Sequence, residues 1–171
     1  TTEIYTYTES SAASDVYKRQ SLHRELLRAR RAEQPVSVIL LDIDRFKQVN
    51  DEHGHDVGDQ VLVELAQQLT RSVRDEDFVY RFGGEEFVIV LPGASLDAAR
   101  ERALAVSRNI RAVTIDTTTV PLKVTISAGV STFPEHGENR EQLLIQADKA
   151  LYLAKQSGRD RIELATVAEA S

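Results

Sequence analysis

The sequence predicts an α+β fold in which helices flank a central, mostly antiparallel sheet. Strand-like and helical patterns alternate along the chain without a regular β-α-β repeat. Two strand-like segments are separated only by a glycine pair, which is typical of a hairpin. Another strand-like run, residues 35–44, is apolar on both faces and therefore belongs in the middle of a sheet. With 171 residues, the chain is long enough for one domain with a sizeable core.

Composition excludes several classes of protein. The formal net charge is −6, so the chain has no basic footprint for polymeric nucleic acid. It has no cysteine, which excludes disulfides and thiolate metal sites, and no apolar run approaches the ~20 residues of a membrane helix. The chain also lacks methionine, and we interpret it as a piece of a longer protein. We expect this domain in the cytoplasm and leave a membrane anchor in the full-length protein open.

The first half of the chain predicts two helices around a buried strand. Residues 1–20 are rich in Thr and Ser and show no period, so we expect them to be loose. A short charged helix follows from Leu22, and residues 45–59 predict a helical turn and then a loop. The next helix is indicated by apolar residues repeating at i+4: Val61, Leu65, Leu69 and Val73.

The second half predicts a hairpin, two helices and two more strands. The hairpin strands are 78–82 and 86–91, joined through Gly83 and Gly84, because glycine reaches the positive φ that tight turns require. A helix over 96–113 has Ser95 as its N-cap. The stretch 122–130 alternates as a strand. A helix from about Arg140 ends with Gly158 as its C′ residue, before a last strand at 160–164.

Acidic residues at strand ends indicate a metal site. Asp42 and Asp44 end the buried strand, where uncompensated carboxylates are costly. If the hairpin places Glu85 beside them, the oxygens form a cage suited to Mg²⁺ or Mn²⁺, as phosphoryl and nucleotidyl transfer require. Two plainer interpretations remain open: either aspartate could cap the following helical turn, and the hairpin could hold its glutamates in water.

Three motifs together resemble the GGDEF family of diguanylate cyclases: "LLDIDRFKQVND" (40–51), "GHDVGD" (54–59) and "RFGGEEF" (81–87). The resemblance runs from about Leu22 to Leu164. It implies a fold similar to the nucleotide cyclase and polymerase palm, with the domain at 21–166 and a tail at 167–171. The implied reaction condenses two GTP molecules into cyclic di-GMP and releases two pyrophosphates.

The resemblance also implies residue roles. The Asp42 carboxylate, the Ile43 carbonyl and Glu85 would bind Mg²⁺ or Mn²⁺, and Glu85 would help activate the attacking 3′-hydroxyl. Lys47 would face the phosphates. The remaining substrate-binding residues would be Asn50 and Asp59, which read guanine, and His55, Gly83, Gly84, Lys155 and Arg159. A carboxylate matches the two donors on the guanine edge. Lys155 and Arg159 could instead simply complement a helix C-terminus.

Regulation and assembly follow from the same resemblance. Arg74 and Asp77 match an inhibitory site for the product, although charge-rich turns of this kind are common. Turnover would require a homodimer, because one domain holds one GTP, and an upstream sensor domain would control that encounter. Two alternatives remain open: a degenerate module that only binds GTP or cyclic di-GMP, and a different nucleotide cyclase.

The start of the chain departs from the family. The stretch "SAASDVYKRQ" (11–20) lacks the apolar anchors that normally precede the first helix. We therefore interpret residues 1–20 as a disordered, non-native segment that has replaced the native start.

Overall fold

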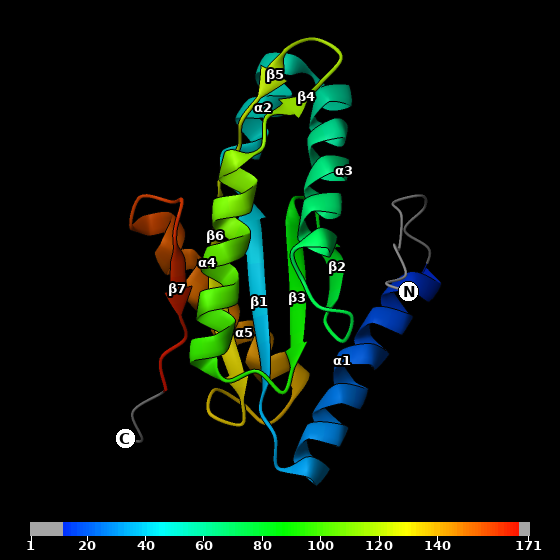
Figure 1. Ribbon diagram of the computed structural model, residues 1–171, viewed down its shortest axis with the longest axis vertical. Helices are drawn as coiled ribbons and strands as arrows, with labels where there is room; N and C mark the ends of the chain where they lie inside the picture. The colour runs from blue at the N-terminus through cyan, green and yellow to red at the C-terminus, as the bar shows by residue number, and fades with distance from the viewer. Residues whose placement is uncertain (1–11, 168–171) are drawn as a thin grey trace.

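A computed structural model describes residues 12–167 as one α+β domain built on a five-stranded sheet (Figure 1). The helices are α1 (Ala12–Ala32), α2 (Phe46–His53), α3 (His55–Arg71), α4 (Leu96–Ala112) and α5 (Arg140–Gln156). The strands are β1 (Val36–Ile43), β2 (Phe78–Gly83), β3 (Glu86–Pro92), β4 (Ile115–Asp116), β5 (Pro121–Leu122), β6 (Ile126–Phe133) and β7 (Ile162–Leu164).

The sheet has the strand order β2-β3-β1-β6-β7, with β1 in the centre. β1 pairs antiparallel with both β3 and β6, and only β7 runs parallel to its neighbour. The predicted mostly antiparallel sheet is therefore confirmed. All eight residues of β1 are buried, including the polar Ser37 and Asp42, as the apolar character of both strand faces predicted.

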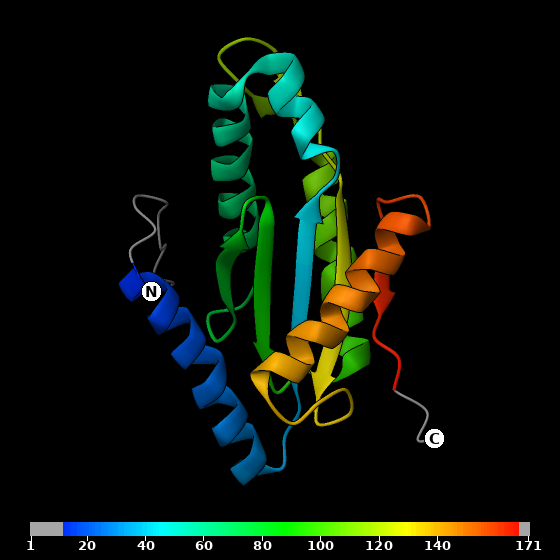
Figure 2. The same cartoon turned by 180° about the vertical axis from the view of Figure 1, so that it is seen from behind.

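Helices cover both faces of this sheet, so the core has two layers. Because side chains alternate along β1, Ile39 and Leu41 point into the layer formed with α3 and α4, whereas Val38 and Leu40 point into the layer formed with α1 and α5. Figure 1 shows α3 and α4 in front of the sheet, and Figure 2 shows α5 in front on the opposite face. Among the described residues, no helix has the length and apolar character needed to cross a membrane.

Two predictions for the first half of the chain are wrong. Helix α1 begins at Ala12 rather than Leu22, so residues 12–20 are helical and not loose, while residues 1–11 lie outside the described part. No Gly or Pro interrupts Ala12–Ala32, and extending an existing helix costs little. The loop predicted within 45–59 is almost entirely helical. Gly54, with φ of 90°, is the single residue that separates α2 from α3.

The second half follows the predictions more closely. Ser95 caps α4, its side chain accepting a hydrogen bond from the Ala98 N–H at 3.2 Å, and Gly158 follows α5 with φ of 111°. The strand predicted over 122–130 instead begins at Ile126 and extends to Phe133, buried throughout.

The alternation in β6 reflects small residues under a helix rather than exposed polar ones. The Ser131 hydroxyl donates to the Leu143 carbonyl of α5 at 2.8 Å. A Cβ atom added at Gly129 would overlap the Ala147 carbonyl of α5, so glycine there lets the helix approach the strand closely. Buried small residues and exposed polar ones give the same pattern in sequence.

Candidate active site

Three carboxylates gather where β1 ends and β3 begins, and we call Asp42, Glu85 and Glu86 the acidic edge. Asp42 of β1 lies directly opposite Glu86 of β3 in the antiparallel register. The Ile43 N–H donates to the Glu85 carbonyl at 3.4 Å, which ties the hairpin tip to the end of β1. The structure therefore brings together the predicted metal ligands Asp42, Ile43 and Glu85, and adds Glu86.

One cation lies against the acidic edge. The Lys155 ammonium of α5 donates to Asp42 Oδ2 at 2.7 Å. Burial nevertheless raises the pKa of Asp42: Lys155 opposes that rise, while the charges of Glu85 and Asp44 add to it. Burial also raises the pKa of Glu86, and the facing Asp42 charge raises it further. The edge thus carries more negative charge than Lys155 offsets.

The hairpin turn differs by one residue from the prediction. Gly83 belongs to β2 and pairs with Glu86, so the two turn residues are Gly84 and Glu85 rather than Gly83 and Gly84. Gly84 has a φ of 21°, and its carbonyl accepts from Arg81 Nε at 2.6 Å. A Cβ atom at Gly84 would meet no described atom within 4 Å. This placement puts Glu85 at the tip of the hairpin with open space beside Gly84.

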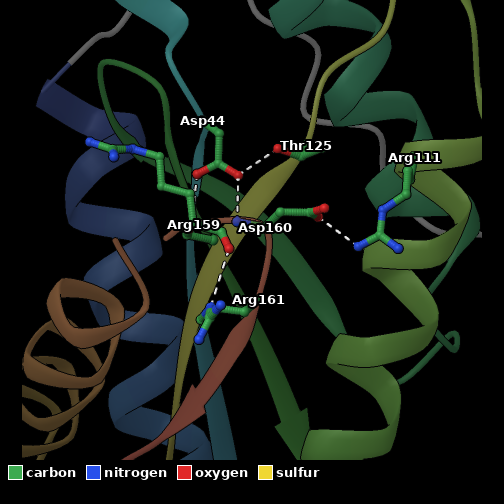
Figure 3. Close-up of polar contacts among 7 residues, drawn as sticks. Asp44, Arg111, Thr125, Arg159, Asp160 and Arg161 are labelled. Atoms are coloured by element: carbon green, nitrogen blue, oxygen red, sulfur yellow. Dashed lines mark hydrogen bonds and ion pairs between the residues drawn. The ribbon is translucent and has the colours of Figure 1, made fainter. Parts of the chain in front are cut away.

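Asp44 has a different role from Asp42. Its carboxylate accepts from the hydroxyls of Thr125 and Ser127, both at 2.6 Å, and from the Asp160 N–H at 3.0 Å (Figure 3). It does not cap α2, which begins after Arg45 without a side-chain capping bond. The capping interpretation is therefore wrong for Asp44, and its oxygens are already engaged by three donors.

The residues predicted to read guanine lie on α2 and α3, which follow β1 directly. Asn50 is half-buried on α2, whereas Asp59 and His55 are exposed on α3. A Cβ atom added at Gly58 would overlap Oδ1 of Asn50, so this glycine leaves the space that the Asn50 side chain occupies. Sequence reasoning missed Gly58, and its position next to Asp59 in "GHDVGD" was the available signal.

Two predicted phosphate-binding cations share one open groove. Lys47 and Arg159 both line it, together with Arg45, which sequence reasoning missed. Its remaining lining residues are Gln48, Asp51 and Glu52. Lys155 lies instead at Asp42, in the acidic edge. Arg45 precedes Lys47 by two residues in the same motif, and that second cation was the signal for it.

The predicted inhibitory residues lie at the opposite end of β2 from the hairpin tip. Asp77 is buried, and its Oδ2 accepts from the Arg74 N–H at 2.9 Å and from the Arg102 guanidinium at 3.0 Å. Burial raises the pKa of Asp77, while these two donors oppose the rise. The Arg74 guanidinium is exposed and lies 3.8 Å from Glu76. Sequence reasoning missed Arg102, whose position on α4 gives no local signal.

The acidic edge suits a hard divalent cation in its donor chemistry. Its groups are carboxylate and carbonyl oxygens, which Mg²⁺ and Mn²⁺ prefer. Within the described residues, no three acidic or histidine side chains converge as a ready ligand cluster. In this arrangement Asp42 Oδ2 pairs with the Lys155 ammonium at 2.7 Å instead.

Comparisons with known proteins agree on one family. The family model described as "Diguanylate cyclase, GGDEF domain" matches residues 15–161. Diguanylate cyclase DgcP of Pseudomonas aeruginosa is 42% identical over 146 residues, which cover 85% of this chain and 22% of that protein. The chain spans less than a third of the length of such curated relatives.

Solved structures give the same result. The GGDEF domain of YfiN (TpbB) from Pseudomonas aeruginosa is 33% identical with a TM-score of 0.84, covering 88% of this chain and 94% of that one. The GGDEF domain of DgcB from Caulobacter crescentus, in complex with c-di-GMP, is 28% identical with a TM-score of 0.78, covering 85% and 86%. With its signature glutamates at the hairpin turn beside the end of the central strand β1, the chain belongs to the GGDEF family of diguanylate cyclase domains.

Proposed function

We propose that this domain condenses two GTP molecules into cyclic di-GMP with release of two pyrophosphates. The observation that carries the proposal is the acidic edge, where Asp42, Glu85 and Glu86 face a single lysine. A partly buried excess of negative charge is costly for a fold, and such clusters of acids are typical of functional sites. The family match and the name of DgcP support this reaction.

The acidic edge would bind Mg²⁺ or Mn²⁺ through Asp42, the Ile43 carbonyl and Glu85. When bound, the metal polarises phosphoryl oxygens and stabilises the charge that develops on them. The metal would compete with Lys155 for Asp42, because Asp42 Oδ2 is now 2.7 Å from the ammonium. A displaced Lys155 would then be available to the triphosphate, so one side chain would serve the empty and the loaded site.

The chemistry has two equivalent steps. In each, a ribose 3′-oxygen attacks the α-phosphorus of the other GTP, the bond to the β-phosphate breaks, and pyrophosphate leaves with its electron pair. Glu85, which lies at the hairpin tip, would take up the 3′-hydroxyl proton through its carboxylate. Lys47 and Arg159, which line one groove, would offset the charge of the phosphates.

Guanine would be selected by Asn50 and Asp59, with Gly58 keeping the space for the Asn50 side chain. A carboxylate accepts from both the N1–H and the N2 amine of guanine, and adenine lacks this donor pair. ATP would leave the polar groups of the pocket unpaired, which gives strong discrimination. His55 lies at the start of α3 in the same segment and would contact substrate.

Turnover would require a homodimer, because each domain presents one acidic edge to one GTP. An upstream sensor domain would bring the two domains together. The product would inhibit through Arg74 and Asp77, a proposal supported by the DgcB domain having been solved with c-di-GMP. The exposed Arg74 guanidinium can fork onto a phosphate or guanine, while Arg102 already holds Asp77 in place.

The test is a product assay on the chain fused to a dimerising coiled coil. The protein is incubated with Mg²⁺ and either GTP or ATP, and products are identified by mass spectrometry. We expect cyclic di-GMP from GTP, no cyclic product from ATP, and no product from Glu85→Ala. Glu101→Ala, an exposed glutamate on α4, is the matched control and should retain activity. GTP binding without product from the dimerised protein would indicate a binding module instead.

A further inference from the structure

We propose that Asp44 is a positioning residue that holds the loop 157–161 in the conformation that presents Arg159 to the GTP phosphates. This inference rests on the proposed function, which assigns Arg159 to phosphate binding. Asp44 itself contacts neither metal nor substrate in this account. Its effect reaches the nucleotide through the backbone of the loop.

The first observation is that Asp44 bonds the loop directly. Asp44 Oδ2 accepts from the Asp160 N–H at 3.0 Å, one residue after Arg159, and from the Thr125 hydroxyl at 2.6 Å. Its other oxygen accepts from the Ser127 hydroxyl at 2.6 Å. Asp44 is only 8% exposed, and hydrogen bonds to a buried carboxylate are among the stronger ones in proteins. The loop is thus tied to the end of β1.

The second observation is that the loop needs such a tie. Arg159 and Asp160 are consecutive non-glycine residues in the left-handed region, with φ of 64° and 49°. Side chains disfavour this conformation, and two in a row persist only where surrounding contacts impose it. The Arg159 N–H donates to the Ala154 carbonyl at 3.0 Å, so α5 fixes one side of the loop. Asp44 holds the other side through the Asp160 N–H, and the Ala128 N–H of β6 donates to the Arg161 carbonyl at 3.0 Å.

The third observation is the direction in which the restrained backbone points the Arg159 side chain. Arg159 is exposed and lines the groove that Lys47 also lines. Figure 3 shows the Arg159 side chain extending away from Asp160, on the side of the loop opposite the Arg111 partner. The Asp160 carboxylate accepts from Arg111 of α4 at 2.6 Å, which anchors that side chain elsewhere. The left-handed pair therefore sends its two side chains in different directions.

A double-mutant cycle tests whether Asp44 acts through Arg159. The affinity of the full chain for α,β-methylene GTP with Mg²⁺ is measured by calorimetry, because the carbon bridge blocks loss of pyrophosphate. The variants are Asp44→Ala, Arg159→Ala and the double variant. We expect each single change to weaken binding about tenfold, as for loss of a hydrogen bond to a charged group. The double variant should bind no more weakly than Arg159→Ala.

Two controls distinguish the loss of Arg159 positioning from a general loss of structure. Affinity for guanosine, followed by NMR titration, should be unchanged in all variants because it lacks phosphates. Ser127→Ala removes a partner of Asp44 that does not touch the loop and should change GTP-analogue affinity less than about twofold. If Asp44→Ala does not fold, Asp44→Asn replaces it: this variant keeps the size of the side chain but removes the charge that strengthens the bond from the Asp160 N–H.

The outcomes are distinct. Normal affinity in Asp44→Ala overturns the inference, as does a loss that persists undiminished in the Arg159→Ala background. Normal affinity in Arg159→Ala overturns both the phosphate role of Arg159 and the inference that depends on it. In that case the product assay on Glu85→Ala still decides the proposed function.

Discussion

Asp42 and Asp77 are both buried aspartates with raised pKa values, and each pairs with one cationic side chain, yet their surroundings differ in charge. Among the described residues, the charges of Glu85 and Asp44 raise the pKa of Asp42, Glu86 lies opposite it, and Lys155 opposes them. Asp77 instead accepts from a backbone N–H and from Arg102. The two sites lie toward opposite ends of the strands, and β2 alone spans six residues, about 20 Å at ~3.3 Å per residue.

This difference indicates what each carboxylate can do. Asp77 is already satisfied by its own fold, so it orders the turn before β2 and holds Arg74 at the surface. Asp42 keeps an unfavourable charge that its fold does not offset, and a divalent cation would relieve it. Burial alone does not distinguish an acid that can bind a metal from one whose charge its own fold already offsets. The balance of neighbouring charge does.

The largest expected effect comes from neutralising the acidic edge. Asp42→Asn or Glu85→Gln should lower cyclic di-GMP formation by more than about a thousandfold, because a metal ligand is lost. The initial rate of product formation is measured by chromatography. Circular dichroism should show the fold retained. Activity within tenfold of the parent would remove the substituted residue from the site.

The next largest effect is expected at the proposed product site formed by Arg74 and Asp77. Arg74→Ala should leave the initial rate unchanged and raise the product concentration needed for half-inhibition by about tenfold or more, since a bidentate contact is lost. Glu76→Ala, which removes only the exposed partner of Arg74, is the matched control. Unaltered inhibition in Arg74→Ala would exclude this turn as the product site.

A smaller effect concerns stability and pH. The pKa values of Asp42 and Glu86 are raised in the folded protein. Their contribution to the free energy of unfolding is therefore fully favourable below the ordinary carboxyl pKa near ~4, and it is lost as pH rises through the raised values. At pH 7, Mg²⁺ at ten times its Kd should stabilise by about 1.4 kcal/mol, or ~3–6 °C in Tm.

This metal response separates the two aspartates. Asp77→Asn should keep the Mg²⁺-dependent rise in Tm, and Asp42→Asn should lose it. The response should also weaken on acidification, since protons compete for the same oxygens. Scanning calorimetry with and without Mg²⁺ at several pH values measures both effects. An equal rise in both variants would place the metal elsewhere.

The smallest expected effect comes from a substitution that changes the stability of the fold alone. Ser95→Ala removes the cap of α4 and should cost about 1 kcal/mol of unfolding free energy. Denaturant unfolding gives the value, and catalysis, product inhibition and the Mg²⁺ response should all be unaltered. A change in any of these three would show that α4 couples to the sites.

Local patterns predicted the strands of the five-stranded sheet, the hairpin and the acids, because those features are encoded by neighbouring residues, whereas the short strand β4 was not predicted. The sequence of β1 predicts a buried strand, and Ser95 and Gly158 are recognisable as helix-capping residues. The start of α1 and the helices around Gly54 were missed, since polar helical segments resemble loops when no apolar face is visible. Arg102 and the loop bond of Asp44 join residues far apart in the chain, and no spacing rule connects them.

The most direct test of this account is a Mn²⁺ titration followed by electron paramagnetic resonance, with α,β-methylene GTP present. We predict that the parent chain and Asp77→Asn bind Mn²⁺ equally, and that Asp42→Asn and Glu85→Gln bind it at least about tenfold more weakly, as loss of a charged ligand requires. Equal binding in all four proteins would contradict the claim that the excess charge of the acidic edge holds the metal.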